Sequence, residues 1–287
     1  AKGAAFKDYV LDYSPDNIDN ADNSFTIADY SKFDTVDSSH YSSTMPWHIL
    51  QVHNSIKKHV PWFNYIESII DATANVGVDS IHFAANLENA AITAVEIEKK
   101  EYDALKKNIE SFNYVSRIIP VNDDINNVIE KLIKKKSRVD LIYMDPPWGG
   151  HNYRDADNDS LMLFLSNKPI YEIVNKIIKT NIAKVIALKV PNNFALTEFK
   201  RNLTEKNKVI FIDDISHEKS KKKGFKIITI DVYEKNEKLP QKTAGEKSEE
   251  ITDKSEETTD EYLYIYGQKN KILNLKSLRY LIEAAFD

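Results

Sequence analysis

The sequence predicts an α/β fold in which a mostly parallel sheet of seven strands, with an antiparallel last strand, is covered by helices on both faces. The first observation is that apolar, strand-sized segments alternate with helix-sized ones between residues 66 and 234. Such alternation gives right-handed crossovers and parallel strands. The second is a lysine-rich turn, without a helix, between the last two strands, which predicts that the final strand is reversed.

The first 65 residues are expected to form an N-terminal helical arm. Residues 1–45 are rich in Asp, Asn, Ser and Tyr and show little periodicity, which is typical of a loosely structured segment. In residues 46–65, Ile49, Val52, Ile56 and Val60 recur at helical spacing, which predicts an amphipathic helix.

The core, residues 66–234, follows in regular order. Strands are expected at residues 69–71, 92–96, 118–121, 141–144, 184–190, 209–215 and 225–234. Helices are expected at residues 79–87, 99–113, 125–135, 170–179 and 196–205. After the core, residues 235–261 are almost free of apolar side chains and predict a flexible acidic insert. The C-terminal part, residues 262–287, is expected to add a strand at 262–266 and a helix at 273–285.

Composition limits the possible functions. Cysteine is absent, which excludes disulfides and thiolate metal sites and is typical of an intracellular protein. The seven histidines are scattered, so we expect no metal site. The net charge of −5 argues against a protein that coats nucleic acid non-specifically. We see no secretory signal and no apolar run of membrane-spanning length.

The loop after the first strand, DATANVGVD, is a candidate ligand loop, since ligands collect beyond the carboxyl ends of parallel strands. Asp71 ends the strand, and Thr73, Asn75 and Gly77 follow it. A loop of this kind brings backbone N–H groups and a helix start close to a ligand. Asparagine is, after glycine, the residue that best tolerates a left-handed backbone, so Asn75 can take a glycine's place.

Two further acids follow the next two strands. Glu96 ends the second strand, where a carboxylate can accept hydrogen bonds from both ribose hydroxyls of an adenosine. Asp124 follows the third, where it can accept a hydrogen bond from an adenine amino group. The alternative interpretation is that these acids only cap helices.

The strongest local signal is DPPWGG at residues 145–150, directly after the fourth strand. An aromatic amino group is a poor nucleophile because its lone pair is delocalised into the ring. If Asp145 and the carbonyl of Pro146 hold its two hydrogens, the lone pair is oriented toward a methyl donor. Trp148 offers a flat surface on which a base can stack, which contributes about 1–3 kcal/mol. The alternative is a proline-rich turn with Trp148 in the core.

An (Asp/Asn/Ser)-Pro-Pro-aromatic motif at this place resembles the amino-group methyltransferases of the class I Rossmann-like fold. Within that group, PPWGG is similar to the trimethylguanosine synthase family, which methylates N2 of guanine in the 7-methylguanosine RNA cap. The likeness covers residues 66–233 and includes the Asp71–Gly77 loop, Glu96, the loop containing Asp124 and the VPNN segment at residues 190–193.

The resemblance implies S-adenosylmethionine as cofactor and capped RNA as partner. It implies that Asp145 and Pro146 are catalytic and that Asp71, Thr73, Asn75, Gly77, Glu96 and Asp124 bind the cofactor. It further implies that Trp148 stacks on the methylated guanine, with Pro147, Gly149, Asn192 and Trp47 as further substrate contacts. Tyr30, Phe33, Tyr41 and Trp47 of the arm would help to enclose the cap.

The chain departs from the family pattern at two places. Asn75 and Val78 stand where that family has glycines, and Asp145 stands where several members have serine. Two alternatives therefore stay open: an N6-adenine or other nucleic-acid amino-methyltransferase, and a methyltransferase fold that binds RNA without catalysis. The cofactor loop precedes DPPW in the chain, an order that favours guanine over adenine. A free-base or protein-glutamine substrate is disfavoured, because those enzymes tend to have Tyr or Phe at the Trp148 position.

Overall fold

The computed structural model describes residues 28–36, 44, 46–205, 208–217, 220–233, 262–263 and 273–274. The chain divides into two compact units, Ala1–Tyr233 and Glu234–Asp287. Within the described residues, no helix combines the length and apolar character needed to cross a membrane.

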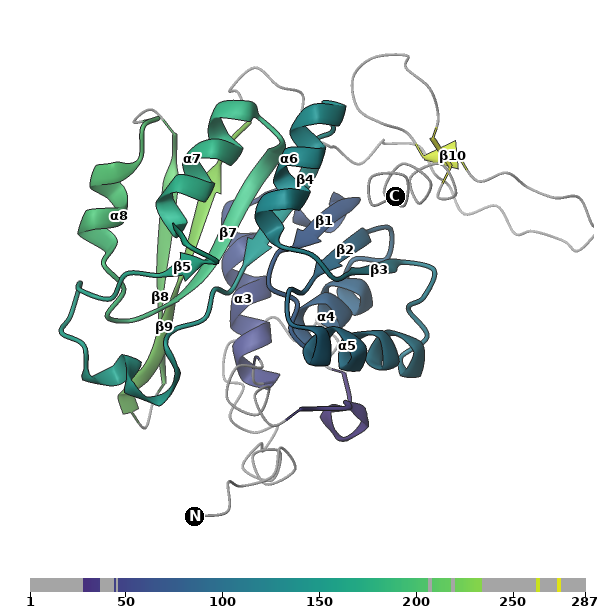
Figure 1. The fold of residues 1–287 in the computed structure, drawn as a ribbon, viewed down its shortest axis with the longest axis horizontal. Coiled ribbons are helices and arrows are strands. Elements are labelled where there is room, and N and C mark those ends of the chain that lie inside the picture. Colours follow the sequence, from purple (N-terminus) through teal and green to yellow (C-terminus); the bar gives the residue numbers. More distant parts are fainter. Residues whose placement is uncertain are drawn as a thin grey trace, which may run out of the picture. The chain divides into compact units, whose positions relative to one another are not determined.

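The first unit contains the predicted seven-stranded sheet (Figure 1). Its strands are β1 (Ser68–Asp71), β2 (Ala91–Val95), β3 (Ile118–Val121), β4 (Val139–Met144), β7 (Ala183–Pro191), β8 (Ile210–His217) and β9 (Ser220–Asp231). They lie in the order β3-β2-β1-β4-β7-β9-β8, and β9 runs antiparallel to both β7 and β8. The prediction of a mostly parallel sheet with a reversed last strand is confirmed.

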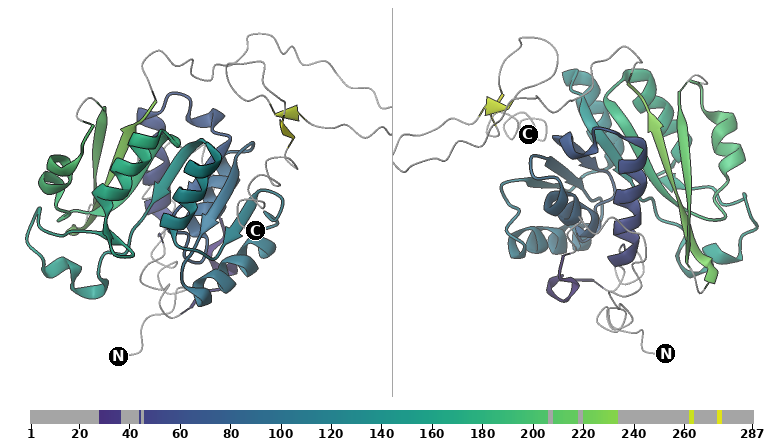
Figure 2. Two further views of the ribbon diagram at one scale, coloured as in Figure 1. Left: turned by 45° about the horizontal axis from the view of Figure 1, so that its top comes forward. Right: turned by 180° about the vertical axis from the view of Figure 1, so that it is seen from behind.

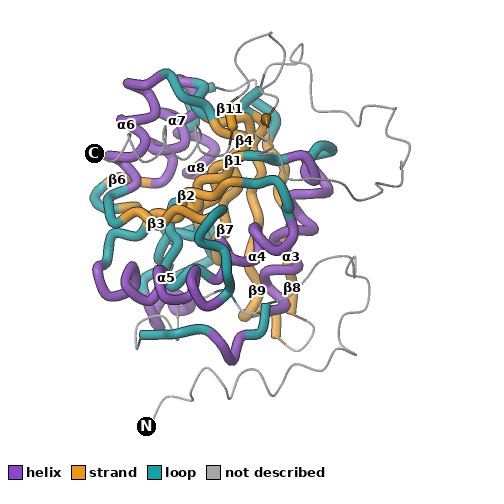
Figure 3. The backbone as a smooth tube through the Cα atoms, turned by 90° about the vertical axis from the view of Figure 1, so that its right-hand side faces the viewer, coloured by secondary structure: helices purple, strands orange, loops and turns teal. Residues whose placement is uncertain are grey.

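Helices cover both faces of this sheet (Figures 2 and 3). They are α3 (Pro46–His59), α4 (Val78–Asn86), α5 (Lys99–Ser111), α6 (Ile125–Lys135), α7 (Ile170–Thr180) and α8 (Leu196–Asn202), with 3₁₀ turns η2 (Tyr30–Lys32), η3 (Phe63–Tyr65) and η4 (Gly150–Asp155). Right-handed crossovers put α4 and α5 on one face, because the chain moves from β1 outward to β3. The chain then returns to β4 and continues to β8, so α6, α7 and α8 cover the other face.

The hydrophobic core lies between the sheet and these two helical layers. All residues of β2 are buried, as are all residues of β7 except Lys184. The strand order reverses between β1 and β4, and this switch point is where an open α/β sheet binds its ligands. The connection from β4 to α7 is long and contains η4 and a small hairpin, β5 (Phe164–Leu165) with β6 (Lys168–Pro169).

Three expectations about local structure were wrong. The first helix ends at His59 rather than at residue 65, because Pro61 cannot continue it. The lysines at residues 221–223 belong to β9 and not to a turn. In the second unit, β10 (Tyr262–Leu263) pairs with β11 (Leu273–Asn274). The expected terminal helix therefore does not start at residue 273, because Leu273 is a strand residue that pairs with Leu263. The insert at 235–261 and the rest of the C-terminal part lie outside the described residues.

Candidate active site

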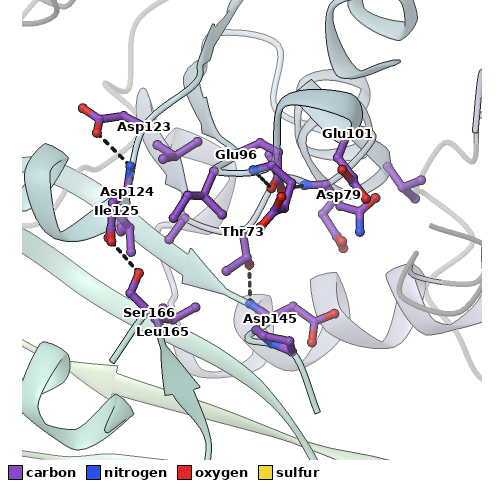
Figure 4. Close-up of a pocket in the computed structure, with 18 of the residues that line it drawn as sticks. Thr73, Asp79, Glu96, Glu101, Asp123, Asp124, Ile125, Asp145, Leu165 and Ser166 are labelled. Atoms are coloured by element: carbon purple, nitrogen blue, oxygen red, sulfur yellow. Dashed lines mark hydrogen bonds between the residues drawn. The ribbon is translucent and has the colours of Figure 1, made fainter. Parts of the chain in front are cut away.

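A cavity of about 450 Å³ opens at the carboxyl ends of β1, β2, β3 and β4. Figure 4 shows Asp124 and Ser166 at one end, Asp79 and Asp145 at the other, and Glu96 between them. Seven lining residues are acidic, and none of the described lining residues is Lys, Arg or His. The cavity is lined by Thr44, Ala72, Thr73, Ala74, Asn75, Val78, Asp79, Val95, Glu96, Ile97, Glu98, Glu101, Asp123, Asp124, Ile125, Asp145, Pro147, Leu165 and Ser166. Its negative potential favours a cationic ligand.

The loop between β1 and α4 adopts a left-handed backbone at an asparagine and a glycine, the two residue types that tolerate it best. Asn75 has φ 50° and Gly77 has φ 94°, so the expectation that Asn75 supports a left-handed backbone is confirmed. A Cβ on Gly77 would lie 2.6 Å from the Leu105 side chain, so glycine lets this loop pass close to α5. Val78 is the first residue of α4, a helical position that needs no glycine.

Asp71 stabilises this loop through hydrogen bonds from Thr73 and Ser80. It is fully buried, and its Oδ2 accepts a 2.6 Å hydrogen bond from Ser80 Oγ while Oδ1 accepts a long one from the Thr73 N–H at 3.4 Å. Burial, with the neighbouring Asp79, raises the pKa of Asp71 to about 8. Asp71 and Gly77 shape the loop without lining the cavity, whereas Thr73 and Asn75 line it.

Glu96 lies just after β2 and lines the middle of the cavity. Its Oε2 accepts a hydrogen bond from the Asn75 N–H and its Oε1 one from the Glu98 N–H, both at 2.8 Å. Burial raises its pKa. Each carboxylate oxygen can accept a second hydrogen bond, so Glu96 keeps the capacity to bind a ribose.

Asp124 caps α6 and lines the cavity at the same time. Its Oδ1 accepts a 2.8 Å hydrogen bond from the Asn126 N–H, which is the helix cap, and its Oδ2 accepts one from Ser166 Oγ. The helix-cap interpretation of this acid is therefore correct, and the position also faces the ligand space. Ser166 belongs to the turn between β5 and β6, which closes this end of the cavity.

The DPPW loop is fastened to the loop after β1 by one hydrogen bond, from the Asp145 N–H to Thr73 Oγ1 at 2.8 Å. The Asp145 side chain is 12% exposed, and its Oδ2 lies 2.7 Å from Lys189 Nζ. Within the described chain, no hydrogen bond reaches Oδ1 of Asp145 or the carbonyl oxygen of Pro146. Both oxygens thus lack a partner, but Asp145 lines the cavity, whereas Pro146 is buried and does not line it.

Burial raises the pKa of Asp145 to about 6, and the Lys189 ammonium limits that rise. Trp148 lies close enough to favour the charged carboxylate as well, although its buried Nε1 forms no hydrogen bond of good geometry. Asp145 is therefore mainly ionised at neutral pH, the state in which a carboxylate only accepts hydrogen bonds.

Sequence reasoning missed Lys189. It is a single lysine near the end of the apolar strand β7 and is 4% exposed. The β4–β7 register, which pairs Met144 with Leu188, brings Lys189 beside Asp145. A cation inside an otherwise buried strand is the signal that could have found it, since a lysine is almost never fully buried without a partner.

Trp148 lies beside the cavity and not in its wall. The indole is partly buried, and its ring meets that of Tyr153 edge to face, with 5.2 Å between centroids and 77° between planes. Pro147 is exposed and lines the cavity, while Gly149 turns the chain with φ 92°. Stacking on Trp148 would therefore use a surface next to the cavity.

The segment after β7 forms hydrogen bonds with the segment that follows DPPW. Asn193 Nδ2 donates to the carbonyl of Tyr153 at 2.6 Å and to that of Ala156 at 3.1 Å, so it holds η4 in place. Asn192 is partly buried and packs against Gly224 of β9, where its Nδ2 would lie 2.6 Å from an added Cβ. Asn192 does not line the cavity.

Part of the N-terminal arm reaches the site. Thr44 is 1% exposed and lines the cavity, and its Oγ1 donates to Asp79 Oδ2 at 2.6 Å while it accepts from Lys189 Nζ at 2.9 Å. Phe33 packs instead on Phe112, with 4.6 Å between ring centroids, and does not line the cavity. The side chains of Tyr30, Tyr41 and Trp47 lie outside the described part of the chain.

Known proteins resemble this chain in sequence and in fold. Residues 66–270 match the RNA cap guanine-N2 methyltransferase family. An uncharacterized protein of Acanthamoeba polyphaga mimivirus, L320, is 30% identical over 132 residues, which are 46% of this chain and 48% of that protein. The trimethylguanosine synthase of Schizosaccharomyces pombe is 28% identical over 128 residues, 43% of this chain and 52% of the synthase. The chain thus spans about half the length of these curated relatives.

Among solved structures, the METTL16 methyltransferase domain superposes with a TM-score of 0.54 at 12% identity, over 81% of this chain and 94% of that domain. At this identity the likeness concerns the fold, which is the class I Rossmann-like methyltransferase fold that the sequence predicts. Because the family match extends over more than half of its length, the chain belongs to the RNA cap guanine-N2 methyltransferase family.

Proposed function

We propose that this protein transfers a methyl group from S-adenosylmethionine to the exocyclic N2 of guanine in a 7-methylguanosine RNA cap. The observation that carries the proposal is Asp145 Oδ1, an acceptor without a hydrogen-bond partner in the described chain, in the wall of an acidic cavity and next to the unpaired carbonyl of the buried Pro146. Family membership and the likeness to the S. pombe trimethylguanosine synthase support the guanine substrate.

The cavity suits S-adenosylmethionine by charge and by its acceptors. The ligand carries a sulfonium and an ammonium, and the seven acidic lining residues favour a cation. Glu96, whose oxygens each accept one backbone hydrogen bond, would bind the ribose hydroxyls. Asp124 and Ser166 would face the adenine, and Asp79 and Asp145 would lie at the sulfonium end (Figure 4). When bound, S-adenosylmethionine supplies an electrophilic methyl carbon.

The chain's own residues then orient the amine. Asp145 Oδ1 and the Pro146 carbonyl would each accept one N–H of the guanine amino group, which directs the nitrogen lone pair toward the cavity. As the new N–C bond forms, the bond between the methyl carbon and the sulfonium sulfur would break and leave neutral S-adenosylhomocysteine. The nitrogen becomes positively charged, and the nearby carboxylate stabilises that charge. Asp145 or water then accepts the N–H proton. Trp148 would support the purine ring by stacking.

The test is methyl transfer from tritiated S-adenosylmethionine to three substrates: an oligonucleotide with a 7-methylguanosine cap, the same one with an unmethylated guanosine cap, and an uncapped adenine-rich one. We expect label in the 7-methylguanosine cap, and mass spectrometry of the digested cap should locate it on N2. Label in adenine would overturn the guanine assignment.

A non-catalytic role is tested by calorimetry on the same protein. Binding of S-adenosylmethionine is expected, since Asn75 and Gly77 give the loop its turns despite its few glycines. Capped-RNA binding without any S-adenosylmethionine binding would contradict an enzymatic role and favour a binding module.

A further inference from the structure

Lys189 is a buried cation that joins the parts of the reaction centre. Its Nζ donates to Asp145 Oδ2 at 2.7 Å and to Thr44 Oγ1 at 2.9 Å. The same ammonium lies over the Trp148 ring, 5.5 Å from its centroid, and 5.7 Å from that of Phe225. With 4% of its side chain exposed, Lys189 has lost most of its hydration, and these contacts replace it.

We infer that Lys189 is a positioning residue, which holds the Asp145 carboxylate and the Trp148 indole in the arrangement that methyl transfer requires. This inference rests on the proposed function for its kinetic consequences only. It assigns Lys189 no contact with the methyl donor, because Lys189 does not line the cavity.

The first consequence concerns the orientation of the carboxylate. Asp145 is fixed at its backbone by Thr73 and at Oδ2 by Lys189, which leaves Oδ1 as the oxygen that can face a substrate amine. Without the ammonium, the carboxylate could rotate about its terminal torsion, which is soft. A small misplacement of an orienting group is enough to slow a reaction about 10²-fold.

The second consequence concerns charge. The charged or titratable groups of the described chain that face Asp145 are Lys189 on β7, Asp79 on α4, Asp71 on β1 and Tyr143 on β4. The last three disfavour a further negative charge, so Lys189, with a smaller contribution from Trp148, keeps Asp145 ionised. An enzyme with a neutral residue at position 145 would not need this cation. We therefore expect the buried lysine at position 189 to accompany the aspartate at the first position of the DPPW motif.

The third consequence concerns Trp148. An ammonium over an indole is attracted by the ring's negative face, and this contact helps to fix the ring plane. A stacked base then has to use the part of the indole that the ammonium leaves open. Lys189 thus links the hydrogen-bonding and the stacking parts of the proposed site.

The chain contains a matched control for this role. Lys184, at the other end of β7, forms an ion pair with Asp140 of β4 at 2.7 Å, and its Nζ lies over the Trp62 ring at 5.6 Å. Lys184→Met therefore removes the same kinds of contact as Lys189→Met, but far along the strand from DPPW.

The experiment compares Lys189→Met, Lys189→Arg and Lys184→Met in the full chain. Calorimetry first shows that each variant binds S-adenosylmethionine. A ¹³C-NMR titration of aspartate-labelled protein, with the Asp145 signal assigned through Asp145→Asn, then measures the pKa of Asp145. The pH profile of kcat and KM is measured with a 7-methylguanosine-capped oligonucleotide. If Lys189→Met does not bind S-adenosylmethionine, Lys189→Gln is measured in its place, with the same expected result.

We expect Lys189→Met to raise the pKa of Asp145 by about 1–3 units and to lower kcat at pH 7 at least about tenfold, with partial recovery at higher pH. Lys189→Arg should keep the Asp145 titration close to that of the wild type, and Lys184→Met should change neither quantity. An unchanged Asp145 titration in Lys189→Met, or equal losses of kcat in Lys189→Met and Lys184→Met, would overturn the inference. If the wild type methylates no capped RNA, the proposed function fails, and the NMR titration still decides the role of Lys189.

Discussion

Replacing Trp148 by alanine tests whether a base stacks on this side chain. The expected loss of binding affinity can be worked out from the site. Stacking of one base on an aromatic side chain contributes about 1–3 kcal/mol, which corresponds to about 5–150-fold in Kd. The ring is partly buried and held by the edge of Tyr153, so little ordering is needed when a base binds. A cationic 7-methylguanine adds a cation–π contribution, but the Lys189 ammonium over the same ring opposes it.

We therefore expect Trp148→Ala to weaken the binding of a 7-methylguanosine cap analogue about 10–100-fold, and Trp148→Phe to restore part of the loss. The assay is calorimetry at saturating S-adenosylhomocysteine, which prevents turnover. Trp62→Phe is the control, because Trp62 is buried and lies beside Lys184, at the other end of β7 from Lys189. The affinity for S-adenosylmethionine should be the same in all variants. Cap binding in Trp148→Ala within about twofold of the wild type would refute the stacking argument.

Three further predictions concern pH and the cofactor loop. The pKa of Asp145 is raised to about 6, and its charged form orients the amine. We therefore expect kcat to be constant above about pH 6 and to fall about tenfold per pH unit below it. A kcat that stays constant down to pH 5 would contradict this. Asn75 has φ 50°, a left-handed backbone that glycine adopts easily and valine does not. Calorimetry should therefore show that Asn75→Gly keeps the affinity for S-adenosylmethionine and that Asn75→Val weakens it at least about tenfold. Equal affinities would show that the left-handed backbone at this position does not matter for binding. The pKa of Asp71 is raised to about 8 in the folded state, so between about pH 4 and 8 the unfolded chain binds fewer protons, and the melting temperature should fall as the pH rises. Asp71→Asn should flatten that dependence, and an unchanged slope would show that Asp71 is not its source.

Most of the fold follows from periodicity. The limits of β3 and α6 agree with the sequence-based ranges residue for residue, because apolar segments alternate there and the cap residue Asp124 precedes α6. The first helix was predicted too long because apolar spacing continues past His59, although Pro61 interrupts the backbone. Leu273 was assigned to a helix from spacing alone, and pairing with Leu263 decides otherwise.

The candidate site could be predicted only where its residues follow strands. Thr73, Glu96 and Asp145 lie within two residues of the ends of their strands, and the parallel sheet brings them to one cavity. Lys189 could not be placed from the sequence, because its partner is set by the β4–β7 register and not by any local pattern. The same holds for Thr44, which reaches Asp79 and Lys189 from a segment with weak periodicity.

Asp145→Asn tests the central claim most directly. The amide keeps one oxygen acceptor and the shape of the side chain but loses the charge that Lys189 pairs with. With capped RNA and S-adenosylmethionine both shown to bind, we predict that kcat for N2 methylation falls on the order of 10²-fold, because orientation and charge stabilisation act in the transition state. A kcat within about twofold of the wild type would mean that Asp145 does not orient the amine, and the account would be wrong at its centre.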